Sequence, residues 1–210
     1  MDISHIHGSI ILSIDEVGSY STDQLVPEEI DDYINKAVRD YINEQRHILR
    51  TDRPEAEEVY NKLYTLETSE IIEFEDNNED VYFLNVSSIP NFDYYISSKV
   101  FFGLGGNKES KYGVLKHKSY FDKYSSTKYN TSLFRHTPVY INDEFLYVLQ
   151  GVDDQEPTSI DVTYLETPTE VSLEDDITVP LPAHTHRDII DLTSQYIINS
   201  LIRQQQGETT

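Results

Sequence analysis

The spacing of apolar residues changes twice along this chain, and the changes separate helical ends from a β-rich middle. Residues 27–49 carry apolar side chains at the three- and four-residue spacing of an amphipathic helix. From Ser69 the spacing falls to two, as in half-buried strands, and over 183–204 it becomes helical again. Because strands and helices do not alternate, we expect an antiparallel sheet. The sequence predicts an α+β fold: N- and C-terminal amphipathic helices packed together, with an inserted antiparallel β-sandwich or barrel-like domain.

The predicted helix over 27–49 has strong signals at both ends, and the cations Arg46, His47 and Arg50 provide those at its C-terminal end. Pro27 suits a first helical turn, and Glu28 and Glu29 complement the positive end of the helix dipole. A shorter helix is expected over 55–66. We expect the helices at 27–49 and 183–204 to share a packing surface that also contributes to an oligomer interface. Its residues are Ile30, Ile34, Val38, Tyr41, Ile189, Tyr196 and Ile197.

These patterns predict three parts. Residues 1–22 form an N-terminal arm with a short strand at 8–14, residues 23–68 and 178–210 form a helical packing domain, and residues 69–177 form the inserted β-rich domain. The expected strands cover 71–74, 81–86, 94–104, 113–117, 138–141, 144–149 and 160–166. Turn residues 76–78 suggest that the first two strands are joined as a hairpin, and Asn142-Asp143 predicts another. Residues 118–137 are expected to form a loop or a short helix at the sheet edge.

Charge is distributed unevenly. The net charge is −22, yet residues 81–138 hold 3 acidic and 8 basic side chains. The basic residues alternate with aromatic ones over 99–136 and form a candidate partner-contact patch: Lys99, Lys108, Lys111, Lys116, Lys118, Lys123, Lys128 and Arg135. Three interpretations stay open: an alternating strand with a solvated loop, a basic edge that docks on an acidic neighbour, or a surface for single-stranded nucleic acid. The negative total disfavours the last, because phosphate binding needs Lys and Arg.

The sequence contains no convincing phosphate-binding, metal-binding or catalytic motif. Gly103-Leu-Gly-Gly106 lacks the ending of a phosphate-binding loop, so a turn with a bulge is the simpler interpretation. The pairs His5/His7 and His184/His186 have no evident third metal ligand. With no cysteine and no paired nucleophile and base, we predict no catalytic, metal or cofactor site and expect the chain not to be an enzyme. Neither a secretory leader nor a membrane-spanning stretch is expected.

Four segments resemble the neck proteins of tailed bacteriophages, in particular the ring-forming head-to-tail connector proteins of crAss-like and related podoviruses. They are Pro27-Glu-Glu-Ile-Asp-Asp-Tyr-Ile-Asn-Lys-Ala-Val38, Ile89-Pro-Asn-Phe-Asp-Tyr-Tyr-Ile96, Val162-Thr-Tyr-Leu-Glu-Thr-Pro168 and Leu181-Pro-Ala-His-Thr-His-Arg-Asp-Ile-Ile-Asp-Leu192. The order of elements also matches, and the resemblance covers about two-thirds of the chain in outline. None of its motifs is catalytic.

This resemblance implies a structural virion protein. The chain would be a subunit of a homo-oligomeric ring in the neck that joins portal to tail. Its partners would be copies of itself, the portal and neighbouring neck or tail proteins. DNA would pass through the lumen without sequence-specific binding, and the ring would be assembled in the host cytoplasm. Two other functions stay open: a β-sandwich binding module for a tail receptor or carbohydrate, and a single-stranded nucleic-acid-binding protein that uses residues 99–135.

Overall fold

The computed structural model describes residues 1–17, 25–49, 55–74, 81–103, 109–119, 136–142, 144–149 and 156–207. The chain divides into two compact units. The helical unit contains Met1–Leu66 and Pro168–Thr210, and the sheet unit contains Glu67–Thr167. The predicted α+β fold, in which terminal helices flank a β domain, is confirmed.

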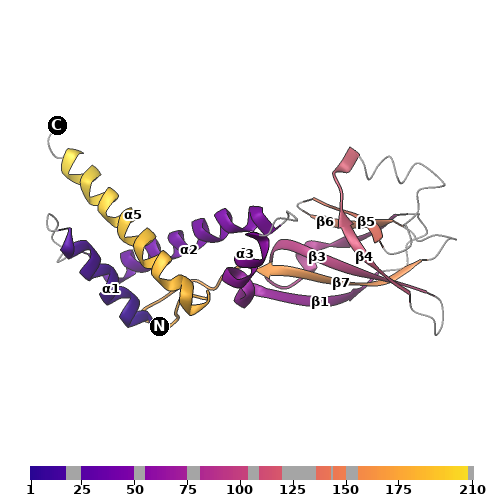
Figure 1. Ribbon diagram of the computed structural model, residues 1–210, viewed down its shortest axis with the longest axis horizontal. Coiled ribbons are helices and arrows are strands. Elements are labelled where there is room, and N and C mark those ends of the chain that lie inside the picture. The colour runs from indigo at the N-terminus through magenta and orange to yellow at the C-terminus, as the bar shows by residue number, and fades with distance from the viewer. Residues whose placement is uncertain are drawn as a thin grey trace. The chain divides into compact units, whose positions relative to one another are not determined.

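Both ends of the chain supply the helical unit. Its main helices are α1 (Ile3–Glu16), α2 (Pro27–Leu49), α3 (Glu55–Leu63) and α5 (His186–Gly207), with 3-10 turns η2 (Tyr64–Leu66) and η5 (Ala183–Thr185). Helix α5 contacts both α1 and α2, and α2 also contacts α3 (Figure 1). The predicted packing of the two terminal helices is therefore confirmed for α2 and α5.

Helix α1 corrects the prediction of an N-terminal arm with a strand at 8–14. Asp2 caps the helix by accepting a hydrogen bond from the backbone N–H of His5 at 2.7 Å. The side chains of Ile3, Ile6 and Ile10 are fully buried. Burying one isoleucine contributes about 1.5–3 kcal/mol, whereas its helix propensity costs under ~1 kcal/mol relative to alanine. Packing therefore outweighs the β preference of these residues.

The predicted shorter helix ends differently from its expected range of 55–66. The α-helix stops at Leu63, and the chain continues as the 3-10 turn Tyr64–Leu66 directly into the first strand. Val59, Leu63 and Leu66 are all buried. The hydroxyl of Thr65 donates to the carbonyl of Pro180 at 2.8 Å, which ties this corner to the segment before α5. The apolar pattern therefore extends through the 3-10 turn.

The sheet unit contains one seven-stranded sheet, in the order β1-β7-β3-β4-β5-β6-β2. Its strands are β1 (Glu67–Glu73), β2 (Val81–Asn85), β3 (Phe92–Phe102), β4 (Glu109–Leu115), β5 (His136–Ile141), β6 (Phe145–Leu149) and β7 (Pro157–Glu166). Each lies within a few residues of a predicted strand. The neighbouring strands are antiparallel except β4 and β5, which are parallel. The expectation of a purely antiparallel sheet is therefore wrong. A parallel pair needs a long connection, and residues 116–135 supply the length.

The predicted hairpin across residues 76–78 is also wrong. Strand β1 pairs with β7, while β2 pairs with β6 at the other end of the strand order. The aromatic rings of Phe74, directly after β1, and Tyr82 of β2 lie 5.9 Å apart in an edge-to-face contact. The sheet is thus curled, so that side chains from its two edges meet. The predicted hairpin at Asn142 is confirmed: β5 and β6 are antiparallel, and the Asn142 side chain accepts from the backbone N–H of Phe145 at 2.7 Å.

One apolar cluster fills the inner face of the sheet. Its fully buried members are Val100, Phe102, Val139, Leu146, Val148, Ile160 and Val162. Gly113 allows β4 to approach β3 closely, since a Cβ atom there would clash with the Ser98 hydroxyl. That hydroxyl is itself buried and shares a 2.9 Å hydrogen bond with Tyr95. A polar pair is thus enclosed beside the core, and the glycine leaves room for it.

Candidate assembly site

The seven residues predicted to form a helix-packing and oligomer surface lie on α2 and α5. Ile34, Ile189 and Ile197 are fully buried, and Ile30, Val38 and Tyr41 are at most 6% exposed. Tyr196 is half-buried. Contacts within one chain therefore cover nearly all of this surface. A neighbouring copy would have to contact other residues.

Polar contacts border the seam between α2 and α5. The hydroxyl of Tyr196 donates to Asp40 at 2.8 Å, and the Nζ atom of Lys36 lies 4.5 Å from the centre of the Tyr196 ring. The hydrogen bond to Asp40 raises the pKa of Tyr196. The Tyr41 hydroxyl donates to Asp188 at 3.4 Å. Burial, followed by the Asp188 charge, raises the pKa of Tyr41 to about 12. Both phenols therefore remain protonated donors at neutral pH.

A polar clamp holds the chain as it returns from the sheet to the helices. The Asn35 side chain on α2 accepts from the backbone N–H of Val171 at 2.7 Å and donates to the Val171 carbonyl at 3.1 Å. One turn earlier, Asp31 accepts from the backbone N–H of Leu173 at 3.0 Å and pairs with the buried His7 at 2.7 Å. Residues 168–177 thus belong to the helical unit, which corrects their predicted place in the β domain. The only sequence signal for this clamp is Asp31 and Asn35 at i, i+4 spacing.

The two histidine pairs have structural roles in the described residues. His186 is 3% exposed, and its Nε2 atom bonds the Leu181 carbonyl at 2.9 Å. Burial lowers the pKa of His186, which favours the neutral ring that donates this bond. Exposed His5 and buried His7 lie two apart on a helix, where side chains point in different directions. No group of three or more metal-ligating side chains is present in the part of the chain that the structure describes.

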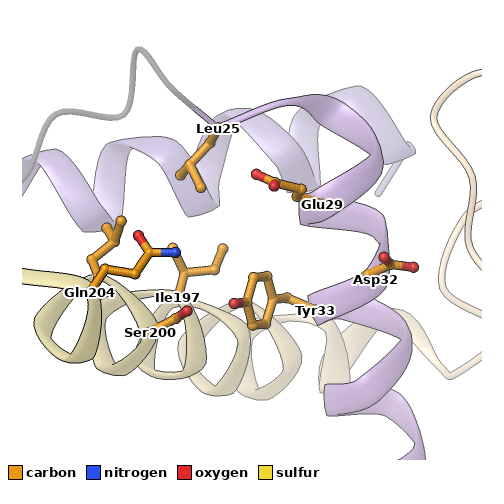
Figure 2. Close-up of a pocket in the computed structure, with 8 residues that line it drawn as sticks. Leu25, Glu29, Asp32, Tyr33, Ile197, Ser200 and Gln204 are labelled. Atoms are coloured by element: carbon orange, nitrogen blue, oxygen red, sulfur yellow. The ribbon is translucent and has the colours of Figure 1, made fainter. Parts of the chain in front are cut away.

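A cavity of about 350 Å³ lies between the start of α2 and the C-terminal half of α5. Leu25, Ile197 and Leu201 contribute apolar surface to it. Glu29 and Asp32 contribute exposed carboxylates. Figure 2 shows Leu25 and Glu29 directed into the space between the helices. The cavity therefore combines an apolar wall with a negative margin.

The predicted basic patch is only partly described. Lys108, Lys123, Lys128 and Arg135 lie outside the described residues. Lys111 is 2% exposed, with its Nζ atom 5.0 Å from the centre of the Phe102 ring, so its place in a surface patch is wrong. The Lys111 side chain points to the inner face of the sheet because β4 alternates and Tyr112 takes the outer face.

The other described lysines of this patch differ in exposure. Lys99 is half-buried and lies 5.5 Å over the ring of Phe101. Lys116 is also half-buried, whereas Lys118 is exposed. Together with the buried Lys111, these three lysines therefore do not form a continuous basic track of the kind that single-stranded nucleic acid needs.

Aromatic side chains form a row on the outer face of the sheet, a feature that the sequence analysis did not isolate. Tyr140, Tyr147 and Phe83 are neighbours in register across β5, β6 and β2. Tyr140 and Tyr147 stack with ring centres 5.6 Å apart, and Phe83 meets Phe145 edge-to-face at 5.6 Å. Phe83 is 45% exposed. Strand alternation directs Leu84 and Leu146 into the core, so the period of two could have located this row.

The remaining candidate motifs give no site among the described residues. Gly103 has a φ of 134°, which suits glycine and fits a turn after β3, while residues 104–106 lie outside the described part.

A scan against protein-family models finds no match to this chain, and a search of curated proteins finds none either. None of the helices in the described residues has the length and apolarity needed to cross a membrane.

Proposed function

We propose that this chain is a structural subunit of a homo-oligomeric ring in the neck of a tailed bacteriophage. The ring joins the portal to the tail, and DNA passes through its lumen. The observation that carries the proposal is the construction of the helical unit from both chain ends around an inserted sheet unit. This is the order of elements that the resemblance to neck connector proteins implies.

The segments that carry the resemblance have well-defined structural roles. Pro27–Val38 supplies the α2 residues that pack on α5 and hold the returning chain. Tyr164 near the end of β7 donates its hydroxyl to the Pro90 carbonyl at 3.0 Å, so two of the four segments meet inside the sheet unit. Leu181–Leu192 contains the start of α5. There the side chain of His186, the first residue of the helix, is hydrogen-bonded to the Leu181 carbonyl. These roles support a scaffold built for assembly.

The charge distribution supports the same role. The helical unit contains 21 acidic and 8 basic side chains. A lumen lined by such a surface would repel the phosphate backbone, so DNA would slide through without adhering. Basic residues of the sheet unit could meet an acidic neighbour instead. Heterologous contacts of this kind close into rings when the rotation between copies is right.

Native mass spectrometry and negative-stain electron microscopy test this proposal. The purified chain is measured alone and with a podovirus portal at several salt concentrations. We expect closed rings, or rings that form only on the portal, and weaker assembly at high salt. A chain that stays monomeric at all concentrations and ignores the portal would contradict the proposal.

The outer aromatic row favours a second candidate function, a binding module that uses the sheet. Exposed aromatic rings on a sheet provide a flat surface on which sugar rings can pack, as in a tail receptor-binding domain. Phe83 is the most exposed member of the row that contacts other rings. We expect Phe83→Ala to abolish glycan-array binding if the row is a ligand surface. Glu67→Ala, on the opposite edge strand, is the control. No binding by the wild-type chain would eliminate this candidate.

A further inference from the structure

The cavity between α2 and α5 has the chemistry of a receptor for a lysine side chain. We propose that it receives Lys118 from a second copy of this chain. The inference rests on the proposed ring function and names the contact that joins neighbouring subunits. It places the acceptor on the helical unit of one copy and the donor on the sheet unit of the next.

The walls of the cavity suit both parts of a lysine. Leu25 and Leu201 offer apolar surface to the methylene stem, which lysine commonly buries while its charge stays near water. Tyr33 offers an aromatic ring, which attracts a cation over its face. The carboxylate of Glu29 lies at the exposed margin, where an ammonium group would end, and Asp32, whose carboxylate is directed outward in Figure 2, adds negative charge beside it. An anionic ligand would be repelled by these charges.

No described contact satisfies either carboxylate with a cation of the same chain. Other charged side chains of the described residues do have partners: His7 pairs with Asp31, Lys62 with Glu58 and Lys111 with Glu109. Lys36 follows Asp32 by one helical turn, but its Nζ atom lies over the ring of Tyr196. Within the described residues, a cation from a second copy would therefore not have to displace a salt-bridge partner of these carboxylates.

Exposure selects Lys118 among the lysines described in the sheet unit. Lys111 is enclosed over the Phe102 ring, and Lys99 is half-buried over Phe101. Lys116 is half-buried, and its backbone N–H donates to the Val139 carbonyl at 2.8 Å, which holds it against β5. Lys118 lies just beyond this attachment and is exposed. It can therefore extend away from the sheet toward another molecule.

The cavity and Lys118 lie on different units of the chain, so one copy can give its Lys118 to one neighbour and receive Lys118 from another, which is a heterologous contact. Each copy then presents one acceptor and one donor, so that every contact leaves one of each for the next copy. This is the requirement for a closed ring, in contrast to a two-fold dimer that consumes both at once. Opposite charges in such an interface also speed encounter and fix register.

Charge reversal tests the contact. Self-association is measured by sedimentation velocity and native mass spectrometry for Glu29→Lys/Asp32→Lys, for Lys118→Glu and for the chain that carries all three changes. We expect each reversal alone to weaken self-association by about tenfold or more, and the combined chain to regain most of the loss. The matched control is Glu28→Lys/Glu57→Lys, which changes the charge equally at exposed acidic positions outside the cavity. Circular dichroism checks that every variant keeps its helices.

The outcomes separate this contact from the ring itself. Wild-type rings that persist in the Glu29→Lys/Asp32→Lys variant, or that weaken equally in the control, would overturn the cavity contact and leave the ring function standing. Loss in the two reversals without recovery in the combined chain would overturn Lys118 as the occupant. A wild-type chain that neither self-associates nor binds a portal would overturn both proposals.

Discussion

Asn35 and Val171 are joined by two hydrogen bonds across 136 residues of sequence. The amide side chain of Asn35 matches the N–H and carbonyl of one peptide position, as a neighbouring strand would. Asp31 repeats this contact one turn earlier by accepting from the backbone of Leu173. The face of α2 is therefore a polar template for the segment that leaves the sheet.

Replacing Asn35 with alanine removes both bonds and leaves two backbone groups without their partner. We expect the free energy of unfolding to fall by about 1–3 kcal/mol, because partly buried groups lose compensation for their desolvation. Chemical denaturation followed by far-UV circular dichroism measures the change. Asn199→Ala on the exposed surface of α5 is the control and should alter stability by under ~0.5 kcal/mol. Equal effects at the two positions would contradict the clamp.

Ile34 is fully buried in the helical unit, so its truncation leaves a cavity. We expect Ile34→Ala to cost about 2–5 kcal/mol of unfolding free energy. Ile34→Asp would abolish assembly by unfolding the helices, since it buries a charge. Leu12→Ala, at a position that is 64% exposed, provides the comparison and should be nearly neutral. Native-like stability of Ile34→Asp would refute the burial of this side chain.

His186 makes the stability depend on pH. Burial lowers its pKa, while the hydrogen bond to Leu181 opposes that shift and the N-terminal charge and His184 add to it. The folded chain thus favours the neutral ring, and below pH 6.5, the ordinary value, the unfolded chain binds more protons. We expect stability to decrease as the pH falls below about 6.5.

Urea titrations at a series of pH values measure this effect. The part of the pH dependence due to His186 should disappear in His186→Gln and persist in His184→Gln, whose side chain is exposed. An unchanged pH profile in His186→Gln would show that the histidine does not contribute.

Gly113→Ala tests the close approach of β3 and β4. The added methyl group would meet the Ser98 hydroxyl and a methyl group of Val139. We expect a loss of about 1–3 kcal/mol from overpacking, partly recovered by adding Ser98→Gly. Gly8→Ala is the control: open space surrounds that position on α1, so the helix should gain up to about 1 kcal/mol. Thermal unfolding of the wild type, Gly113→Ala, Ser98→Gly and their double variant measures the coupling, with Gly8→Ala as the fifth chain.

The spacing of apolar residues along the sequence predicted the positions of helices and strands better than it predicted which strands pair. The helical spacing and end signals of residues 27–49 are confirmed, and every strand lies near its predicted position. The prediction of a strand at 8–14 is wrong because it follows the β preference of Ile10 and Ile11 and the low helix propensity of Gly8, whereas Ile3, Ile6 and Ile10 have helical spacing. That spacing was the better guide, since burial decides helix formation in a packed unit.

Strand pairing depends on contacts far apart in sequence. Turn residues at 76–78 suggested a hairpin, yet β1 finds its partner in β7, which the chain makes last. The cavity could not be predicted either, because Glu29 and Leu201 meet only through the packing of α2 on α5. Lys111 was predicted to be exposed because it is charged. Its burial follows from the alternation of side chains along β4, in which Tyr112 takes the outer face.

Assembly of the helical unit from both termini sets an order for folding during synthesis. Helices α1 and α2 are made before the sheet unit, but the surfaces that α5 covers stay exposed until α5 itself has been made. The sheet unit is complete earlier, once β7 has been made. A nascent chain therefore carries a folded sheet and unshielded isoleucines at the same time. Removal of α5 would uncover the surfaces of α1 and α2 that it contacts, and we expect a chain without α5 to be less soluble than one that contains it.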